Sequence, residues 1–251
     1  MLALEFQRLL HYRTAIIILI LYAALFLLRV VQEFTYVNSS GLPLAAAYAF
    51  SVIWVKLVTA GTACSLLLVV LFTILITDDF QYRIFRQKMI DGATYWYLIR
   101  LKLIDSLLLA SFSMLTVLLI GLCLGGWYAS GTLHFTPSQF IPILSNGLQT
   151  MGFMSLAGLI AIIVRKSGLS IIIFSIYMFV GEPLLLNHLP LRAHRWLPCR
   201  AFFDLTPNMA QVRSAATITD FQIQQSTYLL PLAYILLFWS ISYFLLCRQD
   251  L

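Results

Sequence analysis

The chain has 251 residues, of which 61% are hydrophobic and only 10% are charged. Soluble domains carry about 25% charged residues, so this composition excludes an ordinary soluble protein and predicts an integral membrane protein. The membrane spans leave no room for a separate soluble catalytic domain. Sixteen basic residues against ten acidic ones give a net charge of +6. In a membrane protein, an excess of basic residues is explained first by their preference for cytoplasmic segments, rather than by binding to nucleic acid.

The first segment, residues 1–13, has the spacing of an amphipathic helix. One face holds Leu2, Phe6, Leu9 and Leu10, and the other holds Gln7, Arg8 and His11. Beside a span, such a helix is expected to lie in the membrane interface with its apolar face in lipid. The alternative is an ordinary helical lead-in without a role of its own. No small-residue cleavage pattern follows, so we do not expect a cleavable signal.

Six apolar runs are long enough for a helix that crosses the hydrocarbon core, which takes about 20 residues. They cover residues 14–32, 52–77, 103–126, 140–164, 168–187 and 228–247. A bilayer cannot satisfy exposed backbone groups, and the runs lack the alternation of barrel strands, so each is predicted to be helical. The predicted fold is an all-α membrane protein, a single transmembrane domain over residues 1–251 with a long outer loop at 188–227.

The placement of Lys and Arg orients these spans, because basic residues collect on the cytoplasmic side. If the N-terminus is cytoplasmic, the inner segments hold Arg8, Arg13, Arg83, Arg86, Lys88, Arg100, Lys102, Arg165, Lys166 and Arg248. The outer loops 33–51 and 127–139 then hold none. The loop 188–227 holds four, but a long loop weighs less per charge. We therefore expect both termini in the cytoplasm.

Common catalytic and metal motifs are missing from the sequence. There is no phosphate-binding loop, no G-x-S-x-G and no H-E-x-x-H, so we expect neither an ATP site nor a catalytic residue in this chain. The four cysteines form no C-x-x-C pair, which argues against a zinc site or an internal disulfide framework. His188, His194 and Cys199 share the outer loop, but we interpret them as solvated loop residues rather than metal ligands.

Two ionisable residues are candidates for a translocation pathway. Glu182 stands before Pro183 near the outer end of the fifth run. It is either a polar point at the mouth of a pathway or the residue where the helix ends at the headgroups. Lys56 lies in the outer part of the second run, where snorkelling to the surface explains it at least as well. Gly121 and Gly125 form a small-residue pair suited to close helix packing.

The most polar long stretch is ITDDFQYRIFRQKMIDGATYWYLIRLKLID, residues 76–105. A solvated loop that follows only the positive-inside rule is expected to hold basic residues alone. This stretch also holds paired acidic residues and large apolar residues, which that rule does not predict. The residues that we expect to contact a partner are Asp78, Asp79, Phe80, Arg83, Phe85, Arg86, Lys88, Met89, Asp91 and Gly92. We predict a short helix in the cytoplasmic segment 78–102, ended by Gly92 in a left-handed conformation. Arg100 and Lys102 are expected to anchor the third span at the inner surface.

This connector is similar to the first cytoplasmic loop of ABC-2 type transporter permeases. Those loops carry an acidic residue after the second span, then a short coupling helix, a Gly and a basic pair before the third span. The similarity rests on ITDDF…FRQKMIDG, while GEPLL in the fifth run and the terminal RQDL also resemble recurrent segments of the family. The chain departs from the family at Asp79, where Glu is more usual, and near Arg83 and Ile84, where a small residue or Thr is more usual.

The resemblance implies the membrane-spanning subunit of an ATP-binding-cassette exporter in the bacterial inner membrane. Such a subunit is not itself an enzyme and holds no cofactor, because ATP and Mg are bound by a separate cytoplasmic ATPase that docks on the coupling loop. It pairs in the lipid bilayer with a second copy or a homologous permease, and it does not bind nucleic acid.

The rival hypothesis is an ATP-independent secondary transporter, or an intramembrane enzyme that uses Glu182 with the outer-loop histidines. The sequence shows few charges deep in the spans, which counts against it. The substrate cannot be identified from the fold class.

Overall fold

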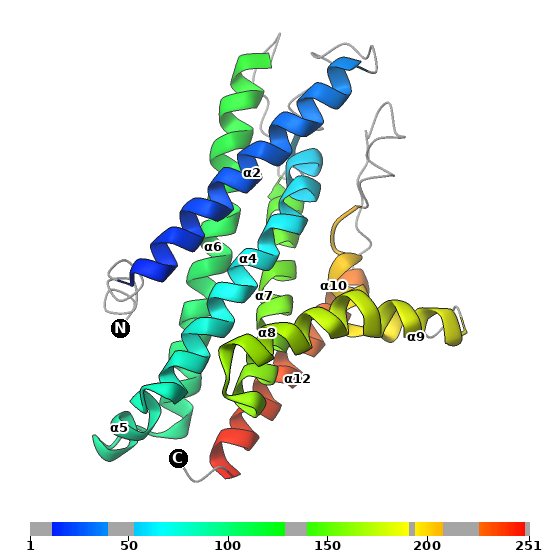
Figure 1. The fold of residues 1–251 in the computed structure, drawn as a ribbon. Coiled ribbons are helices and arrows are strands. Elements are labelled where there is room, and N and C mark those ends of the chain that lie inside the picture. The colour runs from blue at the N-terminus through cyan, green and yellow to red at the C-terminus, as the bar shows by residue number, and fades with distance from the viewer. Residues whose placement is uncertain (1–11, 40–52, 129–139, 191–193, 208–225, 249–251) are drawn as a thin grey trace.

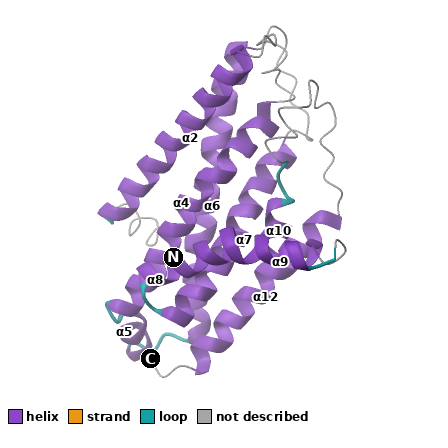
Figure 2. Ribbon diagram, turned by 45° about the vertical axis from the view of Figure 1, so that its right-hand side comes forward, coloured by secondary structure: helices purple, strands orange, loops and turns teal. Residues whose placement is uncertain are grey.

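The protein is described here by a computed structural model over residues 12–39, 53–128, 140–190, 194–207 and 226–248. In these ranges the regular structure is helical, as Figure 2 shows. Among the described residues, six helices are long and apolar enough to cross a membrane. The chain is therefore a multi-pass membrane protein, and the all-α prediction is confirmed. Most of the predicted interfacial helix at 1–13 lies outside the described residues.

Five of the six membrane-spanning helices are continuous α-helices. They are α2 (Arg13–Ser39), α4 (Ile53–Gln81), α6 (Tyr95–Tyr128), α7 (Phe140–Val164) and α12 (Ser226–Arg248). The fifth span in chain order combines three elements, α8 (Ser167–Ile176), η2 (Tyr177–Gly181) and α9 (Glu182–His188). Shorter helices are α5 (Ile84–Ile90), between α4 and α6, and η3 (His194–Trp196) and α10 (Pro198–Phe203), which follow α9.

Helices α4 and α7 form the centre of the bundle. In the most apolar 18-residue stretch of each of these helices, 67% is buried inside the chain. The corresponding share is 22% for α2 and for the fifth span. In Figure 1 the fifth span runs obliquely to α4 and α7. Close packing at the centre depends on glycine: a Cβ at Gly152 of α7 would lie 2.4 Å from the ring of Phe202. The apolar sides of α2 and the fifth span are left for lipid or for another protein.

The fifth span changes its helical geometry in the middle. At the end of η2 the Glu182 N–H donates to the Tyr177 carbonyl, an i→i−5 bond that defines a π-helical turn. The wider turn comes just before Pro183, whose ring lacks an N–H and clashes with the preceding turn of a regular α-helix. The helix then continues to His188. It does not end at Pro183, so Glu182 is not at the end of the span.

Candidate functional site

A cluster of three buried ions joins α4 to α6 at the end of the bundle where α5 lies. The Lys102 Nζ atom is 2.6 Å from Asp79 Oδ2 and 3.0 Å from Asp105 Oδ2. The exposed fractions of Asp79, Lys102 and Asp105 are 0%, 3% and 2%. Buried ions are stable only when they are paired and hydrogen-bonded, so this cluster fixes α4 against α6.

Lys102 therefore lies inside the bundle, and the expectation that it anchors α6 at the membrane surface is corrected. Only Arg100 has the expected setting: it is exposed, with its guanidinium 5.1 Å from the centre of the Trp96 ring. Lys102 finds carboxylate partners within the chain and does not need to end the helix. The helix α6 begins at Tyr95, before the start of the predicted span at residue 103.

The cluster has two carboxyl groups for one ammonium group. Among the described residues, Asp105 Oδ1 has no hydrogen-bond partner. An ionisable group at membrane depth is a functional candidate, and here its partners are visible in the structure.

The short helix α5 is attached to this cluster through aromatic rings. Phe85 is buried, its ring packs edge-on against Phe80 with the centroids 4.7 Å apart, and the Lys102 ammonium lies 6.0 Å from its centre. The Tyr12 hydroxyl donates a hydrogen bond to Asp78 Oδ2, near the end of α4. Burial and this hydrogen bond raise the pKa of Tyr12. The loop is thus held to the spans at several points.

Gly92 ends α5 as the sequence predicted. Its φ is 88°, in the left-handed region that favours glycine. The Gly92 N–H donates to the Met89 carbonyl at 3.0 Å, and the Ala93 N–H donates to the Lys88 carbonyl at 2.9 Å. These two bonds form a Schellman motif, which satisfies the last carbonyls of the helix.

The residues predicted to face a partner divide into two groups. Asp79 and Phe85 lie inside the chain, because one is held by Lys102 and the other forms the attachment of α5. Arg83, Arg86, Asp91 and Gly92 are exposed, and Asp78, Phe80, Lys88 and Met89 are half-buried. Two apolar side chains of the same loop are strongly exposed, Tyr82 at 73% and Ile90 at 78%. A partner would meet the loop at these outer residues.

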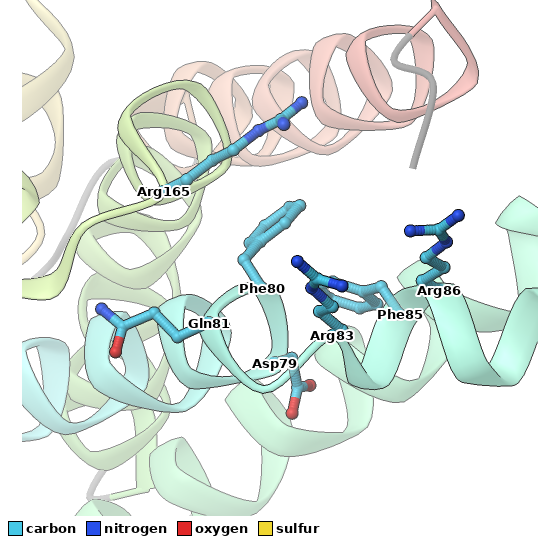
Figure 3. Close-up of a pocket in the computed structure, with 7 residues that line it drawn as sticks. All are labelled: Asp79, Phe80, Gln81, Arg83, Phe85, Arg86 and Arg165. Carbon is cyan, nitrogen blue, oxygen red and sulfur yellow. The ribbon is translucent and has the colours of Figure 1, made fainter.

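Arginines from two parts of the chain surround a hollow beside α5 (Figure 3). Its volume is about 260 Å³, and it is lined by Asp79, Phe80, Gln81, Arg83, Phe85, Arg86 and Arg165. Arg165 comes from the junction of α7 and α8, and its guanidinium lies 5.4 Å from the centre of the Phe80 ring. In Figure 3 the Asp79 carboxylate points away from the three guanidinium groups.

Glu182, the other candidate, holds the short helix α10, which packs against the middle of α7. Its carboxylate is buried and accepts hydrogen bonds from the backbone N–H groups of Cys199 at 2.6 Å and Arg200 at 2.9 Å. The Tyr177 hydroxyl donates a third at 3.2 Å. These amides belong to the first turn of α10, which has no other partner for them and favours a negative charge. Burial and the charge of Glu182 raise the pKa of the Cys199 thiol.

The remaining predicted residues lie apart from both places. Lys56 is half-buried near the start of α4. His188 is exposed, and His194 Nε2 lies 3.0 Å from the Leu189 carbonyl oxygen. Across the described parts of the chain, no three His, Cys, Asp or Glu residues come close enough to hold a metal ion. A role of Glu182 or Lys56 in a translocation pathway stays a prediction.

A buried polar group in α7 is absent from the sequence predictions. Asn146 and Gln149 are fully buried. The Asn146 amide donates to Ser113 Oγ on α6 at 2.8 Å, Ser113 pairs with Tyr22 on α2 at 3.0 Å, and Thr62 on α4 donates to Gln149 at 3.3 Å. Hydrogen bonds between spans add specificity to helix packing in lipid. The only signal in the sequence is the helical spacing of two amides in an apolar run.

No family model and no curated protein matches this chain.

Proposed function

We propose that this chain is the membrane-spanning permease subunit of an ABC transporter, and that a separate cytoplasmic ATPase docks on the loop containing α5. The observation that supports this best is the attachment of α5. Phe85 ties the helix to Lys102, which in turn pairs with Asp79 of α4 and Asp105 of α6. A force applied to α5 would reach two spans at once, which is what a subunit driven from outside requires.

The outer surface of the loop has the composition of a protein interface. Tyr82 and Ile90 are exposed apolar side chains, and Arg86, Gln87 and Asp91 stand exposed around them. Apolar anchors with a charged rim are typical of specific contacts between proteins. A hollow of about 490 Å³ beside the end of α5 offers a place for a partner side chain, with a lining of Lys88, Asp91, Gly92, Ala93, Thr94 and Tyr97.

In this proposal the α5 end faces the cytoplasm, as the distribution of Lys and Arg indicates. The ATPase holds ATP and Mg, and the permease pairs in the bacterial inner membrane with a second copy or a related permease. Asp79 and Phe85 act from inside the chain, by holding the loop in place. ATP-driven closure of the ATPases then tilts the spans, and the resemblance implies export of the substrate.

A second candidate is an ATP-independent transporter coupled to protons. It is favoured by the cluster of Asp79, Lys102 and Asp105, which places three ionisable groups inside the spans. In proteoliposomes without ATP, this candidate predicts that the purified chain dissipates an imposed pH gradient and that Asp105→Asn abolishes the effect. The ABC proposal predicts no such leak.

Co-purification from native membranes tests the ABC proposal. We expect the tagged chain to retain an ATPase subunit, identified by mass spectrometry, and Ile90→Asp to lose it, because a charge replaces an apolar anchor. Leu189→Asp is the matched control, since Leu189 is an exposed apolar residue after α9 and should keep the partner. The proposal fails if the Ile90→Asp variant keeps its ATPase and full ATP turnover.

A further inference from the structure

Arg83, Arg86 and Arg165 contribute three guanidinium groups to the lining of one hollow, which we call the arginine hollow. Within the described residues, none of the three takes part in an ion pair. The carboxylate in the lining, Asp79, lies 2.6 Å from Lys102 and points away from the guanidinium groups (Figure 3). Guanidinium groups favour planar anions such as carboxylate and phosphate, which accept two parallel hydrogen bonds.

The backbone at two of these arginines is unusual. The φ angles of Arg83 and Arg165 are 55° and 58°, and across the described residues they alone among non-glycine residues are positive. Each follows the end of a long helix: the Arg83 N–H donates to the Phe80 carbonyl, and the Arg165 N–H donates to the Ala161 carbonyl. Glycine is usual at such positions, because a Cβ in the left-handed region lowers stability. Arginine therefore stands at both positions at a small cost in backbone stability.

The surroundings of the hollow suit an amphiphilic anion. It lies where the apolar helices α4 and α7 end, which is the depth of lipid headgroups. Ile163, Leu169 and Ile172 stand close to Arg165 in the chain and are 57%, 49% and 54% exposed. A volume of about 260 Å³ is below the roughly 300–1,000 Å³ of sites that enclose a drug-sized ligand. It fits a headgroup whose acyl chains remain outside, along the apolar side chains.

We propose that the arginine hollow binds the phosphate group of an anionic phospholipid in the leaflet at the α5 end. Basic pockets between helices at the membrane boundary bind anionic headgroups in this way. Phe80 and Phe85 form the wall under the phosphate and keep water from one side of the site. The site shares Arg83 and Arg86 with the loop of α5, whereas Arg165 belongs to the α7–α8 junction, so substitutions of Arg165 test it apart from the ABC proposal.

The test measures lipid binding to the purified full-length chain in detergent. Native mass spectrometry counts bound phosphatidylglycerol, and the melting temperature is followed as phosphatidylglycerol, phosphatidylcholine or inorganic phosphate is added. We expect phosphatidylglycerol alone to bind and to raise the melting temperature. Arg165→Gln should weaken this binding about tenfold or more, because it removes charge-assisted hydrogen bonds. Lys166→Gln, at the next exposed residue outside the lining, should bind like the wild type.

Glycine variants separate binding from a structural role. Arg165→Gly and Arg83→Gly should keep or raise the melting temperature in the absence of lipid, since glycine suits the left-handed backbone, yet lose the response to phosphatidylglycerol. If the arginines only neutralise the ends of α4 and α7, both variants would melt lower without lipid and keep an unchanged lipid response. That result would overturn the proposal.

Two further outcomes would also overturn it. Equal stabilisation by phosphatidylcholine would show that the charge of the lipid is not recognised. Stabilisation by inorganic phosphate as strong as that by phosphatidylglycerol, and equally lost in Arg165→Gln, would show that the ligand is a free phosphate and not a lipid.

The two proposals can fail separately. Ile90→Asp should release the ATPase and leave phosphatidylglycerol binding intact, whereas Arg165→Gln should do the reverse.

Discussion

Two buried carboxylates, one near α5 and one beside α10 against the middle of α7, are stabilised in different ways. Asp79 is held by the side chain of Lys102, and Glu182 is held mainly by the backbone N–H groups of Cys199 and Arg200. A side-chain partner can be removed by one substitution, which leaves like charges buried together. Backbone partners remain whatever side chain they carry. The ionic contact between α4 and α6 therefore depends on several side chains. The hydrogen-bonded contact between the fifth span and α10 depends chiefly on one side chain, that of Glu182.

The largest expected effect is that of Lys102→Met. It leaves the carboxylates of Asp79 and Asp105 buried without their ammonium, which should lower the free energy of unfolding by about 3–5 kcal/mol. Unfolding in mixed micelles measures it. Arg100→Met is the control, since Arg100 is exposed on the same helix and should change stability by less than about 0.5 kcal/mol.

Neutralising the two acids as well should restore part of the lost stability, because no charge is then left unpaired. Equal losses in Lys102→Met and Arg100→Met would show that the buried cluster does not hold the spans.

Glu182→Gln should have the next largest effect. The amide keeps one acceptor oxygen but turns an NH2 group toward a backbone N–H, at an expected cost of about 1.5–3 kcal/mol. The raised pKa of Cys199 keeps its thiol protonated and slow to alkylate at neutral pH, so loosening of α10 should appear as faster maleimide labelling.

A background with the exposed Cys123 and Cys247 changed to Ser makes this labelling report on the two buried cysteines, Cys199 and Cys64. Cys64→Ser in the same background separates them. If Glu182→Gln changes neither the labelling rate nor the stability, then Glu182 does not hold α10 in place.

Tyr12→Phe is expected to have a smaller effect at the α5 end. It removes the hydrogen bond to Asp78 and should cost about 1 kcal/mol in the same unfolding assay. Tyr82→Phe is the matched control, because Tyr82 is 73% exposed in the same region and should lose nothing measurable. A loss as large as that of Lys102→Met would mean that Tyr12, rather than the buried ions, dominates the attachment of this end.

Asp204→Asn should have the smallest effect. It removes the exposed ion pair with Arg200 at 3.0 Å, worth about 0.3–0.5 kcal/mol, and added salt should erase the difference. If it costs as much as Glu182→Gln, then α10 is held by its own ion pair, and the contrast between Asp79 and Glu182 disappears.

The sequence predicts the long helices well, because crossing a bilayer imposes a length and a composition on each. The apolar run at 140–164 has the same limits as Phe140–Val164 of α7. The start of α6 differs because Lys102 looks like a surface charge in the sequence, although Asp105 falls inside the predicted span. That they face Asp79 follows from the packing of α6 on α4, which a single sequence does not reveal.

Within the candidate site, local features are predictable and distant ones are not. The left-handed cap at Gly92 follows from a glycine after a short helix. Arg165 is far along the chain from α5, so its approach to Phe80 needs the fold. The burial of Phe85 also depends on tertiary packing, since an aromatic residue in a polar loop fits a partner and its own chain equally well.

The π-helical turn at Tyr177–Gly181 sets the rotational phase of the fifth span. Each residue of an α-helix corresponds to about 100° of rotation, and the wide turn accommodates one residue more than a regular turn. Deleting one residue there would swing Glu182 by about a third of a turn, from the amides of α10 toward the hydrocarbon. A regular helical repeat that is counted from α8 is therefore displaced by one residue when it reaches α9. A helical wheel drawn across the whole span would assign its outward faces incorrectly.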